Sequence, residues 1–94
     1  MSKHIYYDKA SDKSIEMGWD RPLQMYYCVV WPGNDIDSAE EPLYSNLSEP
    51  QLRNPLDHYM TKIAGFDIKL PEGMIGAVVH DRSIDLVNEV RVWE

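Results

Sequence analysis

The sequence predicts a single α+β domain, residues 1–94, in which an antiparallel sheet of about four strands carries two helices packed on one face, in the order β-β-β-α-α-β. Three observations support this prediction. Residues 4–31 have the patterning of strands, residues 48–82 have mostly the apolar spacing of helices, and residues 88–93 return to a strand pattern. A chain of 94 residues has the usual length of one domain.

The first three predicted strands are strongly apolar. Residues 4–8 are rich in tyrosine and isoleucine, which favour strands. Residues 14–19 alternate, and their apolar face consists of Ile15, Met17 and Trp19. Residues 23–31 are apolar on both faces. This strand is therefore expected inside the sheet, with one face on the helices and the other covered by loops or by a second copy of the protein.

An acidic segment separates these strands from the helices. Residues 32–51 contain five acidic residues and neither lysine nor arginine. Within it, residues 42–47 form an apolar patch with two predicted structures: a short edge strand, or a loop held on the core by Leu43 and Leu47. A loop of this length more often has a function than serves as a plain connector.

Capping residues predict the first helix. Asn54 and Pro55 indicate its start, as N-cap and first helical residue, and Gly65 is expected to cap its end. The spacing of its apolar residues places them on one face. That face consists of Leu56, Tyr59, Met60 and Ile63.

The second helix is predicted to begin at Pro71. Its buried stripe consists of Met74, Ile75, Val78 and Val79. Gly73 and Gly76 weaken a helix, and they are interpreted as points of close packing against the sheet. Residues 88–93 form the last predicted strand, with both of their valines on one face.

Composition limits the compartment and the partners. The net charge of −7 argues against direct binding of nucleic acid or anionic lipid, because both require a basic surface, and it permits a basic protein partner. The chain has one cysteine, Cys28, so no internal disulfide can form. Residues 1–8 lack the apolar segment of a signal peptide, and no stretch is apolar enough to span a bilayer. A soluble cytoplasmic protein with no membrane contact is expected.

The sequence contains no motif of a catalytic, metal or cofactor site. A calcium-binding EF-hand loop that started at Asp35 would require glycine where Glu40 stands. The histidines and the cysteine lack the close spacing of zinc ligands. Cys28 lies in an apolar strand without a cationic neighbour, so an unreactive buried thiol is predicted. His58 is expected on the surface and His80 near the end of the second helix. No catalytic residue, metal or cofactor is predicted.

Two segments are richer in recognition residues than a turn or loop requires. Residues 17–24 place Trp19, Asp20 and Arg21 at a hairpin turn, and tryptophan and arginine are common at the energetic centres of protein interfaces. The alternative is structural, with Asp20 accepting hydrogen bonds in the turn and Arg21 over an aromatic ring. The predicted binding residues are Trp19, Asp20, Arg21 and Tyr44.

The same segments resemble a known family. Residues 18–24, GWDRPLQ, and residues 41–47, EPLYSNL, are similar to motifs of a family of short, uncharacterised bacterial proteins. The motifs carry the resemblance directly, and the order of strands before helices extends it to most of the chain. The resemblance implies a bacterial cytoplasmic protein, in keeping with a gene on a mobile element or phage. That family has no established activity, so no catalytic residue follows from the resemblance.

Three functions remain open at this point. The first is a non-catalytic protein-binding or regulatory domain, with a homodimer as one form, based on residues 19–21 and 23–31. The second is an acidic decoy that inhibits a nucleic-acid-binding protein through the acidic loop of residues 32–52. The third is a small-ligand binder or small enzyme. Its polar groups would be Asp20, Arg21, Tyr44 and His58.

Overall fold

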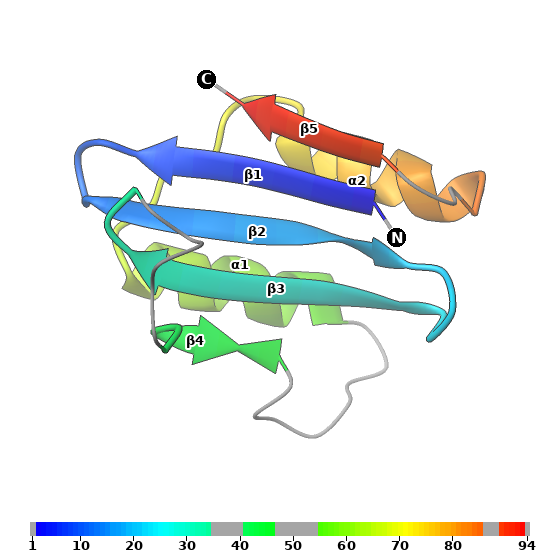
Figure 1. Ribbon diagram of the computed structural model, residues 1–94, viewed down its shortest axis with the longest axis horizontal. Coiled ribbons are helices and arrows are strands. Elements are labelled where there is room, and N and C mark those ends of the chain that lie inside the picture. The colour runs from blue at the N-terminus through cyan, green and yellow to red at the C-terminus, as the bar shows by residue number, and fades with distance from the viewer. Residues whose placement is uncertain (1, 35–40, 47–54, 86–88, 94) are drawn as a thin grey trace.

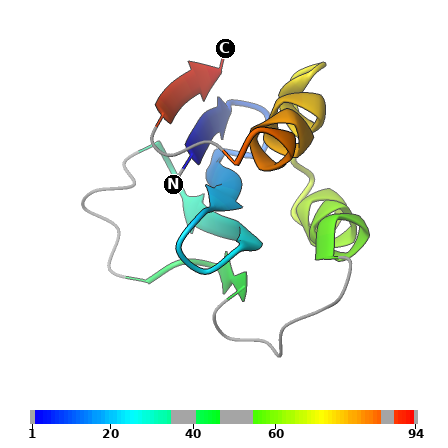
Figure 2. The same cartoon turned by 90° about the vertical axis from the view of Figure 1, so that its right-hand side faces the viewer.

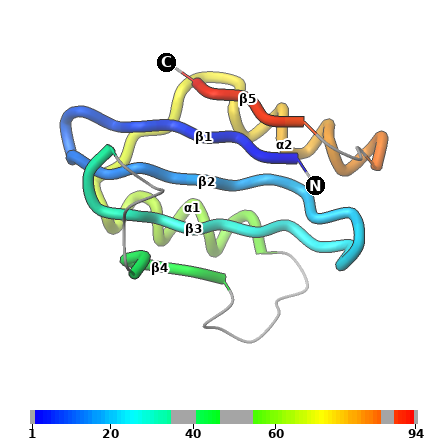
Figure 3. The backbone as a smooth tube through the Cα atoms, in the orientation of Figure 1, coloured from blue at the N-terminus to red at the C-terminus, as the bar shows by residue number. Residues whose placement is uncertain are grey.

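The computed structural model describes residues 2–34, 41–46, 55–85 and 89–93. The fold is of the predicted α+β class, with two helices on one face of a sheet (Figures 1 and 2). The elements are β1 (Ser2–Asp8), β2 (Lys13–Asp20), β3 (Met25–Pro32), β4 (Tyr44–Ser45), α1 (Pro55–Gly65), α2 (Met74–Ser83) and β5 (Glu89–Trp93). The strands lie in the order β4-β3-β2-β1-β5, which the backbone trace in Figure 3 follows.

One strand pair departs from the predicted antiparallel sheet. The pairs β1–β2, β2–β3 and β3–β4 are antiparallel, but β5 lies parallel to β1, with Ile5 opposite Val92. Parallel neighbours require a long crossover connection, and here the chain between β4 and β5 supplies it through both helices. The alternation of apolar residues fixes which face of a strand is buried but not the direction of its neighbour, so the sequence could not show this pairing.

The short strand β4 settles the structure of part of the acidic segment. Tyr44 and Ser45 pair with β3, which confirms a short edge strand. The backbone N–H of Leu43 donates to the carbonyl oxygen of Val30 at 2.6 Å, while the Leu43 side chain is exposed and does not anchor the segment. Leu47 and most of the acidic residues of this segment lie outside the described residues.

The hydrophobic core lies between the sheet and the helices. The predicted apolar face of β2 is confirmed, because all three of its residues are buried there. The alternate residues of β3 complete this layer, and the helices cover it. The buried core consists of Ile15, Met17, Trp19, Tyr26, Cys28, Val30, Tyr59, Ile63, Ile68, Met74 and Val78. One side of β2 and β3 therefore packs against the helices. The other side belongs to the face of the sheet opposite the helices, which is called the open face.

The two helices sit over different strands. Helix α1 packs on β3, whereas α2 packs on β1 and β2 (Figure 2). Helix α1 begins at Pro55 and ends at Gly65, as predicted, while its expected N-cap Asn54 lies outside the described residues. The left-handed residue after this helix is Asp67, with φ of 62°, so the expected glycine cap is not the residue that turns the chain.

The start of α2 and the role of its glycines were predicted wrongly. The helix begins at Met74, because Pro71 opens a single turn, closed by the Met74 N–H on the Pro71 carbonyl, and Gly73 then adopts φ of 89°. Neither Gly73 nor Gly76 is a close-packing point, since a Cβ at either position would have no atom within 4 Å. The glycine that packs closely is Gly18, where a Cβ would overlap the Ser2 carbonyl oxygen.

Candidate functional site

The turn between β2 and β3 does not expose its tryptophan. Trp19 is 4% exposed, and its ring packs edge-on against Tyr26 with ring centres 5.3 Å apart. Its indole N–H donates a hydrogen bond to Asp85 Oδ1 at 2.9 Å. Trp19 is therefore a core residue, and the expectation of an exposed tryptophan at this turn is corrected.

The other two predicted residues of the turn are accessible. Asp20 accepts the backbone N–H of Leu23 at 3.2 Å, as the structural alternative predicts. Among the described residues, no aromatic ring lies beneath the Arg21 guanidinium. Its Nε–H donates to Asp85 Oδ2 at 3.0 Å, and both side chains are about half exposed. The cation over the rings of Trp19 and Tyr26 is Arg82 of α2, 5.5 Å from each ring centre.

Asp85 is the centre of this cluster. Besides Trp19 and Arg21, it accepts a hydrogen bond from Gln24 Nε2 at 2.9 Å. These hydrogen bonds, led by that from Trp19, lower the pKa of the Asp85 carboxyl to about 2 from its usual 3.8. The residues of the GWDRPLQ segment thus hold the hairpin against the end of α2. The side-chain donors of Trp19, Arg21 and Gln24 form intramolecular hydrogen bonds to Asp85.

Tyr44 lies elsewhere, at the edge of the helix-covered side of the sheet. It is half-buried, its ring meets that of Tyr59 edge-on with centres 6.5 Å apart, and Lys62 Nζ lies 5.9 Å from its ring centre. Tyr44 pairs with Val30, four positions along β3 from the residue opposite Trp19. The structure thus does not bring Tyr44 together with the turn residues.

A buried polar cluster that the sequence analysis missed joins β1, α2 and β5. His4 is 3% exposed, and its Nε2 lies 2.5 Å from Asp81 Oδ2. Its Nδ1 accepts the indole N–H of Trp93 at 2.9 Å. Because an indole nitrogen can only donate, Nδ1 carries no proton, so His4 is the neutral Nε2–H tautomer and donates to Asp81.

This cluster and Cys28 have the properties of structural groups. Both ring nitrogens of His4 are occupied by protein partners, the buried Asp81 and the half-buried Trp93, so the imidazole has no nitrogen with which to accept a proton from a substrate. Burial raises the pKa of the Cys28 thiol to about 12, which keeps it protonated and unreactive at neutral pH. Among the described residues, no group of three His, Cys, Asp or Glu side chains could hold a metal ion.

On the face of the sheet opposite the helices, strands β1, β3 and β5 carry apolar side chains, while β2 contributes the polar Glu16. The register places Val92, Ile5, Glu16 and Val29 in one row across β5, β1, β2 and β3. Tyr7 and Trp31, from β1 and β3, belong to the same face and are half-buried. No described helix lies on this side (Figure 2). Residues 23–31 were predicted to be apolar on both faces. In the structure, the described helices cover only one of these two faces.

Strand β5 is the most exposed apolar part of that face. Val90 and Val92 are 63% and 68% exposed. The strand pairs only with β1 and lies at the edge of the sheet, so its outer backbone groups have no strand partner among the described residues. Glu89 and Arg91 point to the helix side, where the Arg91 guanidinium stacks 3.8 Å from the ring centre of Trp93.

No helix among the described residues has the length and apolar character needed to cross a bilayer. No protein-family model, curated protein or solved structure matches the chain.

Proposed function

We propose that this protein is a non-catalytic binding protein that acts as a homodimer, with β5 as the interface. The observation that carries the proposal is an edge strand whose two valines are 63% and 68% exposed. An uncovered strand edge offers a row of backbone donors and acceptors to another strand, and proteins usually protect such edges. Two exposed apolar side chains on an edge that no described strand pairs with indicate a surface that a partner covers.

The charges of β5 support a second copy of the chain as that partner. Two β5 strands that run antiparallel, with Val90 opposite Val90 of the second copy, place Glu89 opposite Arg91 of the second copy twice over. Opposite charges directly across a strand pair stabilise it, and like charges destabilise it. The competing register, with Arg91 opposite Arg91, brings two cations together. The β5 sequence is therefore complementary to itself in one register.

This pairing also continues the apolar face. The Val90 side chains of the two copies would meet on the open side of the sheet, beside the row that contains Val92 and Ile5. The stacking of Arg91 on Trp93 holds the guanidinium in place before the partner arrives, which lowers the entropy lost on association. Two five-stranded sheets would then form one continuous sheet across a twofold axis.

Charge reversal tests the register directly. We expect the wild-type protein to be a dimer by size-exclusion chromatography with light scattering. Glu89→Arg and Arg91→Glu should each be monomeric at the same concentration, because each places like charges opposite one another twice. An equimolar mixture of the two variants should form a heterodimer, because every charged pair across the strands is then opposite in sign.

The matched control is Leu23→Ser, which removes a side chain that is 61% exposed on the β2–β3 turn. This variant should remain dimeric. A wild-type protein that is monomeric at all concentrations would contradict the homodimer. A dimer that persists in both charge variants, or a mixture that stays monomeric, would exclude β5 in the proposed register.

A further inference from the structure

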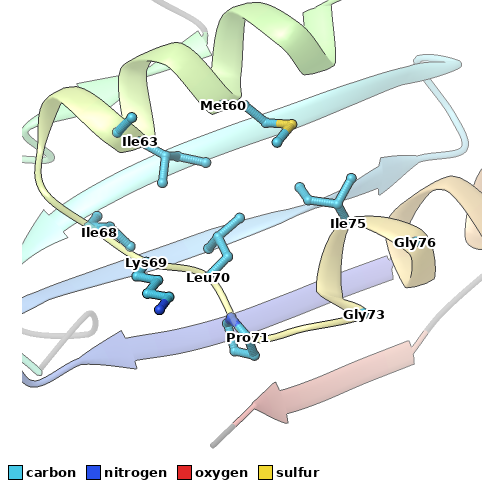
Figure 4. Close-up of a pocket in the computed structure, with 10 residues that line it drawn as sticks. Met60, Ile63, Ile68, Lys69, Leu70, Pro71, Gly73, Ile75 and Gly76 are labelled. Carbon is cyan, nitrogen blue, oxygen red and sulfur yellow. The ribbon is translucent and has the colours of Figure 1, made fainter.

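An apolar groove lies between the two helices (Figure 4). It has a volume of about 400 Å³ and is lined by Met60 and Ile63 of α1, by Ile75 and Gly76 of α2, and by Leu70 and Lys69 of the connection between the helices. The groove lies between helices that cover different strands, because α1 packs on β3 while α2 packs on β1 and β2. The connection forms its floor.

The groove leaves apolar side chains open to solvent. Met60 is 47% exposed, and Leu70 and Ile75 are only half-buried. Figure 4 shows Met60, Leu70 and Ile75 extending into the space between the helices. A volume of this size lies within the range of small-molecule sites, which are mostly apolar with a few polar groups. Methionine adapts its shape to different apolar ligands.

Gly76 gives a second indication that the groove is kept open. It lies inside α2, where glycine costs about 1 kcal/mol relative to alanine. Its backbone does not require glycine, since its φ is not positive, and a Cβ would meet no atom within 4 Å. Packing therefore does not explain the missing side chain. A larger residue at this position would fill the groove.

Among the described residues that line the groove, Lys69 alone is charged. Its backbone N–H donates to Asp8 Oδ2 at 3.1 Å, which fixes the segment that carries it. Its side-chain amine forms no ion pair with another described residue. The net charge of −7 opposes the approach of polyanions, such as nucleotides, so the lysine favours a ligand with one negative charge on an apolar body.

We propose that this groove binds a small amphiphilic monocarboxylate, whose apolar chain lies between Met60 and Ile75 and whose carboxylate contacts the Lys69 amine. The site is separate from β5 and does not depend on dimerisation. Apolar burial supplies most of the affinity, and Lys69 selects the charge of the ligand, because an exposed ion pair contributes little.

Octanoate is a suitable probe, with octanol and octylammonium as ligands of the same chain length but different charge. Isothermal titration should give a dissociation constant of about 1 mM or tighter for octanoate. Octylammonium should bind more weakly, by about threefold or more, because the contact with the Lys69 amine is lost. In Lys69→Gln, the preference for octanoate over octanol should disappear while octanol binding is unchanged.

Two glycine variants test the location. Gly76→Leu fills the groove and should weaken octanoate binding by at least about tenfold. Gly65→Leu is the matched control, because it also places a leucine on a helix where a Cβ has no neighbour within 4 Å, but outside the groove. It should bind octanoate as the wild type does. Circular dichroism must show that both variants are folded.

Three results would overturn the proposal: no binding of octanoate, equal binding of octylammonium, or unchanged binding in Gly76→Leu. A fourth result would also overturn it: the wild type does not bind octanoate, and the oligomeric mass of Gly76→Leu differs from that of the wild type. That result would assign the groove to contact with a second protein chain.

Discussion

The carboxylate of Asp85 accepts the indole N–H of Trp19 at 2.9 Å, across a separation of 66 residues in the sequence. This contact ties the turn between β2 and β3 to the end of α2. Arg21 and Gln24, which lie in the turn itself, donate hydrogen bonds to the same carboxylate. In the sequence this segment has the residues of a recognition loop. In the fold, its side chains hold the turn to the end of α2 through hydrogen bonds to Asp85.

Asp85 should make stability depend on pH in a defined window. Its pKa is lowered from 3.8 to about 2 in the folded protein, so the ionised form is favoured by folding. The contribution is complete above pH 4, roughly the unfolded pKa, and is lost as the pH falls through about 2. Urea unfolding between pH 5 and pH 2 should therefore show a steeper loss of stability in the wild type than in Asp85→Asn.

The control for this prediction is Glu72→Gln, which removes an exposed carboxylate that forms no ion pair with a described residue. Its pH dependence should match that of the wild type in this window. Equal slopes for the wild type and Asp85→Asn would show that the cluster does not favour the ionised carboxylate.

The sequence predicted which face of a strand is buried and where the first helix begins. It did not predict contacts between segments that lie far apart in the chain. Alternation in β2 correctly identified its buried side, and the proline at position 55 correctly marked the start of α1. These features depend on local periodicity and local backbone geometry. The direction of β5 and the partner of Asp85 depend on how segments far apart in the chain meet, which periodicity does not encode.

The buried role of Asp81, which the sequence analysis did not predict, was indicated by a pattern in the sequence. Asp81 follows Met74 and Val78 at helical spacing, so it continues the buried stripe of α2. A carboxylate on a buried stripe requires a polar partner, and the chain has three histidines that could supply it. The start of α2 had no comparable signal, because Pro71 is equally favourable in the single turn that precedes the helix.

The His4 tautomer gives a second prediction. Trp93→Phe removes the only described donor to His4 Nδ1 and leaves this nitrogen without a partner, so the free energy of unfolding should fall by about 1–2 kcal/mol. In the wild type, nitrogen NMR of the imidazole should show a proton on Nε2 and none on Nδ1. Trp31→Phe, on the opposite face of the sheet, should leave this pattern unchanged. A proton on Nδ1 in the wild type would contradict the proposed hydrogen bonds.

Cys28 should be protected from thiol reagents. The thiol is fully buried, and burial raises its pKa to about 12, so very little thiolate is present at pH 8. Labelling with a chromogenic disulfide should be negligible in the folded protein and complete in urea. Labelling of the native protein at the rate of a free thiol would show that β3 is accessible from one side.

Gly18 and Gly76 form a matched pair for the last prediction, because alanine should have opposite effects at the two positions. Gly18→Ala forces a Cβ into the Ser2 carbonyl oxygen, and the shift of β1 that relieves this overlap should lower the free energy of unfolding by about 1–3 kcal/mol. Gly76→Ala meets no atom within 4 Å and gains helix propensity, so it should raise stability by up to about 1 kcal/mol. Urea denaturation of both variants measures the difference. A stabilising Gly18→Ala would show that β1 does not approach β2 as closely as described, and a destabilising Gly76→Ala would show that the groove wall is packed in solution.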